Sequence, residues 1–204
     1  MRISAPLRMN LDTIRVFAIS KLTWIRQQQK KVVEQERESP REYLDRESHY
    51  LWGKRYLLKV VEKDAAPKVE LQHRTLVLQI RPPTTEETKR AVLDEWYRAQ
   101  LKQAASPLIA KWEPLLGVKV ERAFIQRMKT KWGSCKPPSI RLNTDLAKKP
   151  PECLEYIVVH EMTHLLEPTH NARFLGLMDL FLPEWRHLRQ VLNRLPVRHE
   201  TWLY

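Results

Sequence analysis

The chain has 204 residues, of which 43% are hydrophobic and 29% charged, with only four glycines. These proportions exclude collagen-like and wholly disordered proteins, and they predict one domain with an appendage, or two small domains, around a proper core. The net charge of +12 favours anionic partners such as nucleic acid, nucleotides or acidic surfaces. Two cysteines cannot supply a disulfide framework, so we expect a reduced, cytoplasmic compartment.

No targeting or membrane segment is visible in the sequence. The first 17 residues carry a charge every few positions and hold no continuous apolar core of signal-peptide type. No uncharged apolar run approaches the ~20 residues that a membrane-spanning helix requires. We therefore expect a soluble protein without a membrane partner.

The N-terminal portion, residues 1–82, is predicted to combine a helix with a small β-sheet. Apolar residues at helical spacing predict one long helix from Leu11 to about Glu36. Segments rich in β-branched and aromatic residues predict an antiparallel meander formed by Tyr50–Val61, Lys68–His73 and Thr75–Ile80. Three aromatic side chains are expected in the core rather than on a ligand: Phe17, Trp24 and Trp52.

The C-terminal portion, residues 83–204, begins after Pro82-Pro83, although both portions are expected to form one continuous domain. A helix capped by threonine follows, and a second one restarts at Ser106-Pro107 and ends at Gly117. Later elements are expected as strands at Val118–Met128 and Ser139–Asn143, then helices at about Pro151–Leu166 and Arg173–Phe181. Because strands and helices are partly segregated, without strict βαβ alternation, the predicted class is α+β.

Charge is unevenly distributed in this portion. Residues 122–149, here called the basic segment, carry a net charge of +7, whereas residues 150–185 carry −5. Two chemically different surfaces are therefore expected next to each other in sequence.

The motif that carries chemistry is the H-E-x-x-H sequence at residues 160–164. The apolar residues before it predict a half-buried helix, in which His160 and His164 stand on one face, one turn apart. Two imidazoles so placed can bind one metal ion at the ~2.0–2.1 Å typical of zinc. Glu161 projects to the side, where it can take the proton of a metal-bound water and later deliver it to the leaving group.

A catalytic site of this type needs a third protein ligand and keeps a fourth position for water. His170 follows His160 by ten residues, the spacing of the third histidine in the extended H-E-x-x-H-x-x-G-x-x-H signature. Here Glu167 occupies the glycine position, and Pro168 ends the helix by forcing Glu167 out of helical dihedrals. We expect this break to present His170 to the metal, with Glu167 as the weaker rival for the third ligand.

The other histidines have no partner at ligand spacing, so they are expected to be solvated or satisfied in the core: His49, His73, His187 and His199. Cys135 and Cys153 lie 18 residues apart without a C-x-x-C motif. This spacing argues against a structural zinc site and predicts buried thiols.

An ordered set of motifs spans most of the chain. It comprises Arg127–Cys135 (RMKTKWGSC), Ile140–Asn143 (IRLN), Tyr156–His164 (YIVVHEMTH) and His170. Further matches are Trp24-Ile25, Leu51–Leu58, Trp96–Arg98 and Pro183–Arg186. With these motifs the sequence resembles the YgjP-like metallohydrolase family, which is similar to the SprT-like and other zincin metallopeptidases.

The resemblance implies a zincin-like catalytic portion at residues 83–204, with His160, His164 and His170 as metal ligands and Glu161 as the catalytic glutamate. Members of the family look like zinc peptidases, yet the family has also been assigned UTP pyrophosphatase activity. Two departures are Phe174-Leu175, where an aromatic pair is usual, and Asn143-Thr144, where Trp commonly follows Asn. Both are expected to alter the pocket wall and to leave the metal intact.

The basic segment allows two interpretations. In one, Gly133 forms a tight turn, Trp132 packs, and the lysines are solvated. In the other, cationic side chains bind an anionic substrate near the metal: Arg127, Lys129, Lys131 and Arg141. Alternatively, a strand such as Ile140–Asn143 beside the zinc helix binds an extended peptide by edge pairing.

Three functions therefore remain open. The first is a metal-dependent hydrolase of peptide bonds, and the second is the same machinery acting on a nucleoside triphosphate, which the basic segment favours. The third is a nucleic-acid-associated protein that binds through its basic face, although no recognised nucleic-acid-binding motif is present. Zinc is the expected metal, with nickel, manganese or magnesium as alternatives. The sequence leaves the oligomeric state open.

Overall fold

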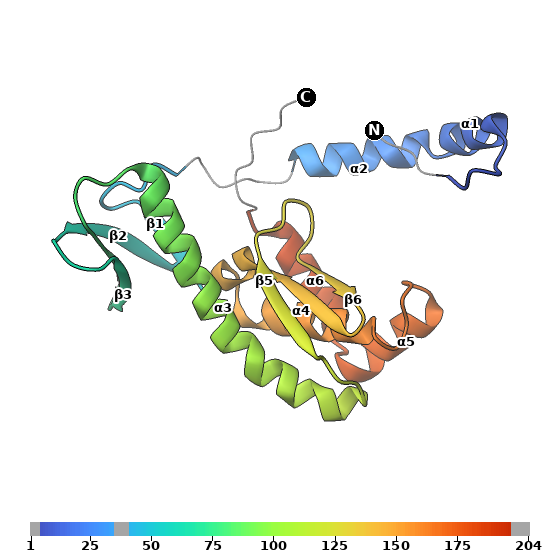
Figure 1. Cartoon of the computed structure of the whole chain (residues 1–204). Helices are drawn as coiled ribbons and strands as arrows, with labels where there is room; N and C mark the ends of the chain where they lie inside the picture. The colour runs from blue at the N-terminus through green and yellow to red at the C-terminus, as the bar shows by residue number, and fades with distance from the viewer. Residues whose placement is uncertain (1–4, 35–40, 197–204) are drawn as a thin grey trace.

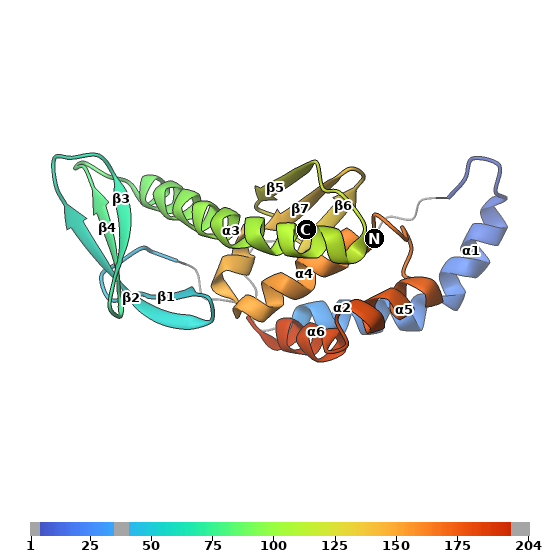
Figure 2. The same cartoon turned by 90° about the horizontal axis from the view of Figure 1, so that it is seen from below.

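The computed structural model describes residues 5–34 and 41–196, which contain six α-helices, one 3-10 helix and seven strands (Figure 1). The strands form two separate small sheets of four and three strands. Both sheets pack on the same long helix, α3, which runs from one to the other (Figure 2). The predicted α+β class is confirmed.

The first sheet contains β1 (Ser48–Leu51), β2 (Lys54–Glu62), β3 (Lys68–Gln72) and β4 (Thr75–Ile80) in the order β1-β2-β4-β3. The predicted antiparallel meander is wrong, because β4 pairs parallel with β2 and antiparallel with β3. Burial explains this order. Leu76, Leu78 and Ile80 of β4 are fully buried, whereas β3 is largely exposed, so the more apolar strand takes the inner position.

The helix α3 (Glu86–Leu116) is continuous, although the sequence predicted a restart at Ser106-Pro107. Thr85 caps its start, and Gly117 ends it in the left-handed conformation at φ 65°. The helix contains Pro107 and Pro114, each of which removes a backbone donor. Buried side chains continue along its whole length: Leu93, Tyr97, Leu101, Ala105, Trp112 and Leu116. This packing stabilises the helix across the prolines.

The second sheet contains β5 (Arg122–Gln126), β6 (Gly133–Lys136) and β7 (Ser139–Asn143) in the order β5-β7-β6. The loop predicted between two strands therefore holds a strand of its own, β6. The strand β7 pairs parallel with β5 and antiparallel with β6. The expectation that Ile140–Asn143 pairs with a peptide is wrong, because both edges of this strand are already occupied.

The chain continues from β7 through a 3-10 helix, η1 (Thr144–Lys148), into α4 (Pro151–Thr163), α5 (Ala172–Phe181) and α6 (Trp185–Arg194). The main hydrophobic core lies between the second sheet, α3 and these three helices. A smaller core, with Leu58, Leu78 and Leu93, joins the first sheet to α3. The helix α6 was not predicted.

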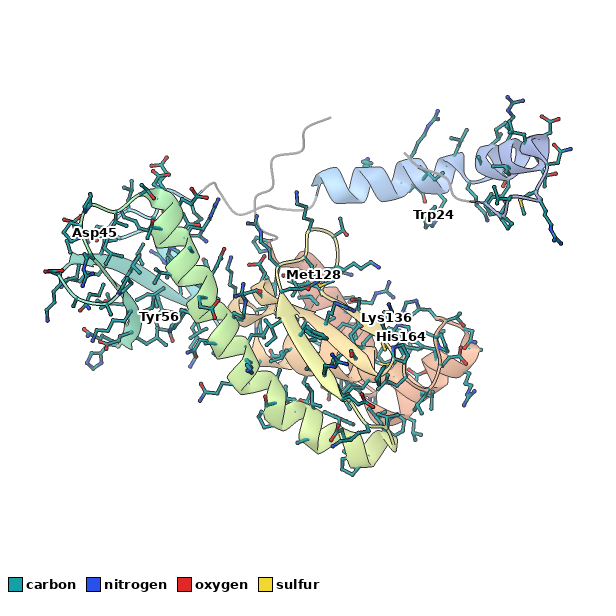
Figure 3. All side chains as sticks on the ribbon, in the orientation of Figure 1. Trp24, Asp45, Tyr56, Met128, Lys136 and His164 are labelled. Atoms are coloured by element: carbon teal, nitrogen blue, oxygen red, sulfur yellow. The ribbon has the colours of Figure 1, made fainter. Side chains whose placement is uncertain are left out.

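The predicted first helix is divided into α1 (Leu11–Ser20) and α2 (Leu22–Glu34) at Lys21. Phe17 and Trp24 are 62% and 60% exposed, so their predicted burial is wrong (Figure 3). The physical reason is that no residue of α1 is buried by another described element. Trp52, in contrast, packs against the main core as expected. None of the described helices is both long and apolar enough to span a membrane.

Candidate metal centre

The helix α4 and its C-terminal cap carry His160, Glu161 and His164. Nine of its thirteen residues are buried, including Val158, Val159 and Met162, and its helical repeat places His160 and His164 one turn apart. His164 is the C-terminal cap of the helix, which ends at Thr163 rather than at the predicted Leu166.

The chain then reverses direction. Backbone N–H groups of Leu165, Leu166 and Glu167 donate to carbonyls of the last helical turn at 2.9–3.0 Å, so they satisfy groups that the helix end leaves open. Asn171 begins the next helix, since its side-chain oxygen accepts a hydrogen bond from the Phe174 N–H at 3.0 Å. His170 immediately precedes this cap, and the reversal brings it over α4.

Three imidazoles meet at one point (Figure 3 labels His164). The Nε2 atom of His170 lies 3.1 Å from that of His164 and 3.1 Å from that of His160. Two nitrogens bound to one tetrahedral ion at ~2.0–2.1 Å lie about 3.4 Å apart. The separations in this structure therefore fit a set of three ligands around a single metal ion.

One ring and one carbonyl hold the histidines in this arrangement. Phe174, only 1% exposed, stacks on His164 with centroids 4.6 Å apart and contacts the other two rings at 5.0 and 4.8 Å. The Nδ1 atom of His164 lies 3.0 Å from the backbone oxygen of Glu167. Since only a protonated Nδ1 can donate to a carbonyl, this contact leaves Nε2 free for a metal.

Glu167, the weaker rival for the third ligand, is engaged elsewhere. Its carboxylate accepts hydrogen bonds from the backbone N–H and the hydroxyl of Thr169 at 3.3 and 3.0 Å. Its contribution to the triad is the backbone oxygen that holds His164. His170 is thus the residue that joins His160 and His164 in space.

Glu161 lies on the side of α4 that faces the second sheet. Its side chain is 5% exposed, and burial raises the pKa of the carboxyl group to about 7, against a smaller opposite effect of the Lys131 charge. Burial and the neighbouring histidines lower the pKa of His160 to about 3, so this imidazole is neutral at physiological pH. A neutral imidazole is the form that binds a metal.

The structure adds a cation that the sequence did not indicate. The positive charge of Arg189, an exposed residue of α6, contributes to lowering the pKa of His160 and His170. The same charge opposes the rise that burial produces in the pKa of Tyr156. The Arg189 guanidinium therefore lies within electrostatic range of the triad. Arg189 itself lies outside the motifs found in the sequence, so nothing there indicated it.

The residues predicted to bind an anion lie in different places. The charge of Lys131 acts on Glu161. Arg127 and Lys129 are exposed in the loop between β5 and β6. Arg141 alternates with the buried Ile140 and Leu142 on β7, and its guanidinium lies 5.4 Å above the Phe124 ring. Arg141 therefore projects from the face of the sheet opposite α4.

Asn143 holds the loop between β5 and β6 in place through hydrogen bonds of its side chain. Its side-chain amide donates to the backbone oxygens of Met128 at 2.9 Å and Lys131 at 2.8 Å. Its side-chain oxygen accepts from the Asp145 N–H at 3.2 Å, which caps η1. The loop between β5 and β6, residues 127–132, is here called the basic loop. The buried asparagine ties it to the start of the segment that leads into α4 (Met128 is labelled in Figure 3).

The remaining predictions on histidine and cysteine have mixed outcomes. His49 is buried, with 4% of its surface exposed, and its Nε2 atom lies 3.1 Å from the Glu47 carboxylate. His73 and His187 are exposed, as expected, and His199 lies outside the described residues. Both thiols are free; Cys153 is buried, whereas Cys135 is only partly covered.

Comparison with known proteins gives one match that spans the chain. The family model described as "YgjP-like, metallopeptidase domain" matches residues 1–195. Among solved structures, the chain is similar to the metallopeptidase zymogen jannalysin of Methanocaldococcus jannaschii, at 20% identity and a TM-score of 0.39. That match covers 43% of this chain and 92% of the other. No curated protein matches the chain.

Proposed function

Because the chain belongs to the YgjP-like family of metallopeptidase domains, we propose that it is a metal-dependent hydrolase that cleaves peptide bonds. In this proposal His160, His164 and His170 hold the metal, and Glu161 is the general base. The observation that carries it is the convergence of three imidazole Nε2 atoms beside a buried carboxyl group whose pKa is raised to about 7.

The donor set favours zinc among the candidate metals. Three imidazoles with a fourth position for water are typical of catalytic zinc, and imidazole also suits nickel. Manganese favours oxygen ligands. Magnesium prefers oxygen ligands and fits this set poorly. When bound, such an ion acts as a Lewis acid that polarises a carbonyl group and lowers the pKa of water.

Glu161 supplies the proton transfers. A carboxyl group that titrates near neutral pH can both accept a proton and return it under physiological conditions. Its burial between α4 and β6 removes it from water, and this burial keeps its pKa above the usual value. We infer that it takes a proton from the attacking water and delivers it to the leaving amine.

The position of strand β6 favours a peptide as the substrate. Among the described strands it pairs with β7 alone, so its other edge keeps unpaired backbone groups. It also lies against α4, since Gly133 directly adjoins Glu161. An extended peptide that pairs with this edge would align its backbone beside the catalytic carboxyl group.

A second candidate is hydrolysis of a nucleoside triphosphate. The observation in its favour is that two cations act on the site: the charge of Lys131 affects the pKa of Glu161, and that of Arg189 affects the pKa of His160 and His170. Phosphate groups require such clamps in addition to a metal. Binding of nucleic acid to the basic segment is a third possibility, and it has only the charge of that segment in its favour.

The test is a panel of casein-type peptides and all nucleoside triphosphates with defined metals, using the native protein and Glu161→Gln. We expect the native protein with zinc to hydrolyse peptides. The Gln variant should bind as much metal and hydrolyse 10²–10⁴-fold more slowly, the usual contribution of a general base. Turnover of nucleotides alone would move the assignment to the second candidate, and equal rates in both proteins would remove Glu161 from the mechanism.

A further inference from the structure

Gly133 is the first residue of β6 and lies directly against the side chain of Glu161. A Cβ atom built on Gly133 would lie 2.6 Å from the Glu161 Oε1 atom, 2.7 Å from its Cγ and 2.9 Å from its Cδ. All three separations are shorter than real contacts of a Cβ atom. The carboxyl group therefore occupies space that exists only because residue 133 has no side chain.

The backbone gives no other reason for glycine at this position. Gly133 is absent from the positive-φ residues of the described chain, which include Gly53 and Gly117. It pairs with Leu142 in an ordinary antiparallel register. Any L-amino acid could therefore adopt its conformation, and the requirement for glycine comes from Glu161.

The main chain at residue 133 is fixed, so it cannot retreat from a larger side chain. The backbone oxygen of Trp132 accepts a hydrogen bond from the Asn143 N–H at 2.8 Å, and the Asn143 amide donates to the Lys131 oxygen. On the other side, Glu161 belongs to the buried helix α4. The Glu161 side chain is consequently the part that moves.

A second observation places the same face of β6 against the carboxyl group. Cys135 follows Gly133 by two residues, which puts both on one side of the strand. Burial raises the pKa of the Cys135 thiol to about 11, and the charge of Glu161 contributes in the same direction.

We propose that Gly133 is a positioning residue: the slot left by its missing side chain sets where the Glu161 carboxyl group lies relative to the histidine triad. This inference rests on the proposed role of Glu161 as the general base. It assigns to the glycine of the W-G-S-C sequence a task distinct from the tight turn expected from the sequence.

The first measurement is the kinetics of Gly133→Ala with zinc. A displacement of about 1 Å at a reacting group can cost 10²-fold in rate. We expect kcat to fall 10–100-fold, with KM within about twofold and the metal content unchanged. Gly176→Ala is the matched control, because a Cβ on that helical glycine meets nothing within 4 Å. Native kcat in Gly133→Ala would overturn the proposal.

The second measurement does not depend on activity. Glu161→Ala removes all three atoms that the new Cβ would meet, so a double-mutant cycle of melting temperatures isolates the contact. Alanine at residue 133 should lower the melting temperature when Glu161 is present and should leave it unchanged, or raise it, in the Glu161→Ala background. An equal change in both backgrounds would contradict the contact. If the native protein hydrolysed nothing, the proposed function would fail while this cycle still reported on Gly133.

Discussion

The two small sheets have related layouts and different tasks. In each, an inner strand pairs parallel with one neighbour and antiparallel with the other: β4, like β2, does so in the first sheet, and β7 does so in the second. The strands β4 and β7 are both buried, and each packs into a hydrophobic core. The first sheet covers the N-terminal half of α3, whereas the second sheet packs on the helix that carries His160 and Glu161.

The two sheets differ in the elements to which β4 and β7 connect. β4 leads through a loop into α3, and its neighbours contribute no residue to the triad. β7 ends in Asn143, which holds the basic loop, and continues through η1 into α4. Its partner strand begins with Gly133, beside Glu161. The same type of sheet thus stabilises the fold in one place and adjoins the proposed general base, Glu161, in the other.

Shortening one buried leucine in each sheet tests this contrast most strongly. Leu142→Ala and Leu78→Ala each remove a fully buried side chain and should destabilise the protein by about 2–5 kcal/mol. Because Leu142 is the cross-strand partner of Gly133, we expect turnover per folded molecule to fall in Leu142→Ala and to stay native in Leu78→Ala. Urea unfolding and kcat measure the two effects, and equal losses of turnover would contradict the contrast.

The stability of the protein should depend on pH in opposite ways through the buried Glu161 and the exposed Glu70. The pKa of Glu161 is raised from 4.5 to about 7 by burial, so the folded state of the metal-free protein binds the extra proton. The free energy of unfolding of the native protein, relative to that of Glu161→Gln, should therefore fall by on the order of 3 kcal/mol as pH rises from about 4.5 to 7.

Glu70 of the first sheet provides the control. The hydrogen bond and charge of Lys68 lower its pKa, so the native protein should lose stability relative to Glu70→Gln as pH falls. Free energies of unfolding across this pH range check both signs. If the native protein instead lost stability relative to Glu161→Gln as pH fell, the Glu161 carboxyl group would not be held in a buried environment.

A smaller effect is expected from the hydrogen bonds that fix the loops. Asn143→Ala removes two donors to the basic loop and should cost about 1–3 kcal/mol. The loosened loop should be cut faster by trypsin after Arg127, Lys129 and Lys131. Glu47→Ala is the control beside the first sheet, where the Glu47 carboxylate accepts hydrogen bonds from the backbone N–H groups of Glu42 and Tyr43. Equal cleavage rates in the native protein and in Asn143→Ala would exclude the anchoring role.

The sequence predicted the elements of the second sheet and α4 better than their pairing. H-E-x-x-H and the Pro168 break depend on local spacing, and the three histidines do come together. Strand order depends on which strand is most buried, so neither the inner position of β4 nor that of β7 was foreseen. Long-range contacts also explain the misses at Phe17 and Trp24, because apolar spacing predicts a buried face and cannot supply the partner.

The site residues that sequence reasoning missed act through contacts across the fold. Phe174 was noted only as a departure from an aromatic pair, yet its ring contacts all three imidazoles. Gly133 was interpreted as a turn residue, because nothing in the sequence shows that Glu161 lies against it. The proposed boundary near residue 82 and the expected compartment stay predictions.

The number of metal ions bound per chain tests the central claim most directly. Elemental analysis would compare the native protein with His160→Ala/His164→Ala and with His49→Ala, a buried histidine of the first sheet. We predict about one equivalent of zinc in the native protein and in His49→Ala, and almost none in the double variant, because two of the three ligands are gone. A full equivalent of metal in the double variant would contradict the account.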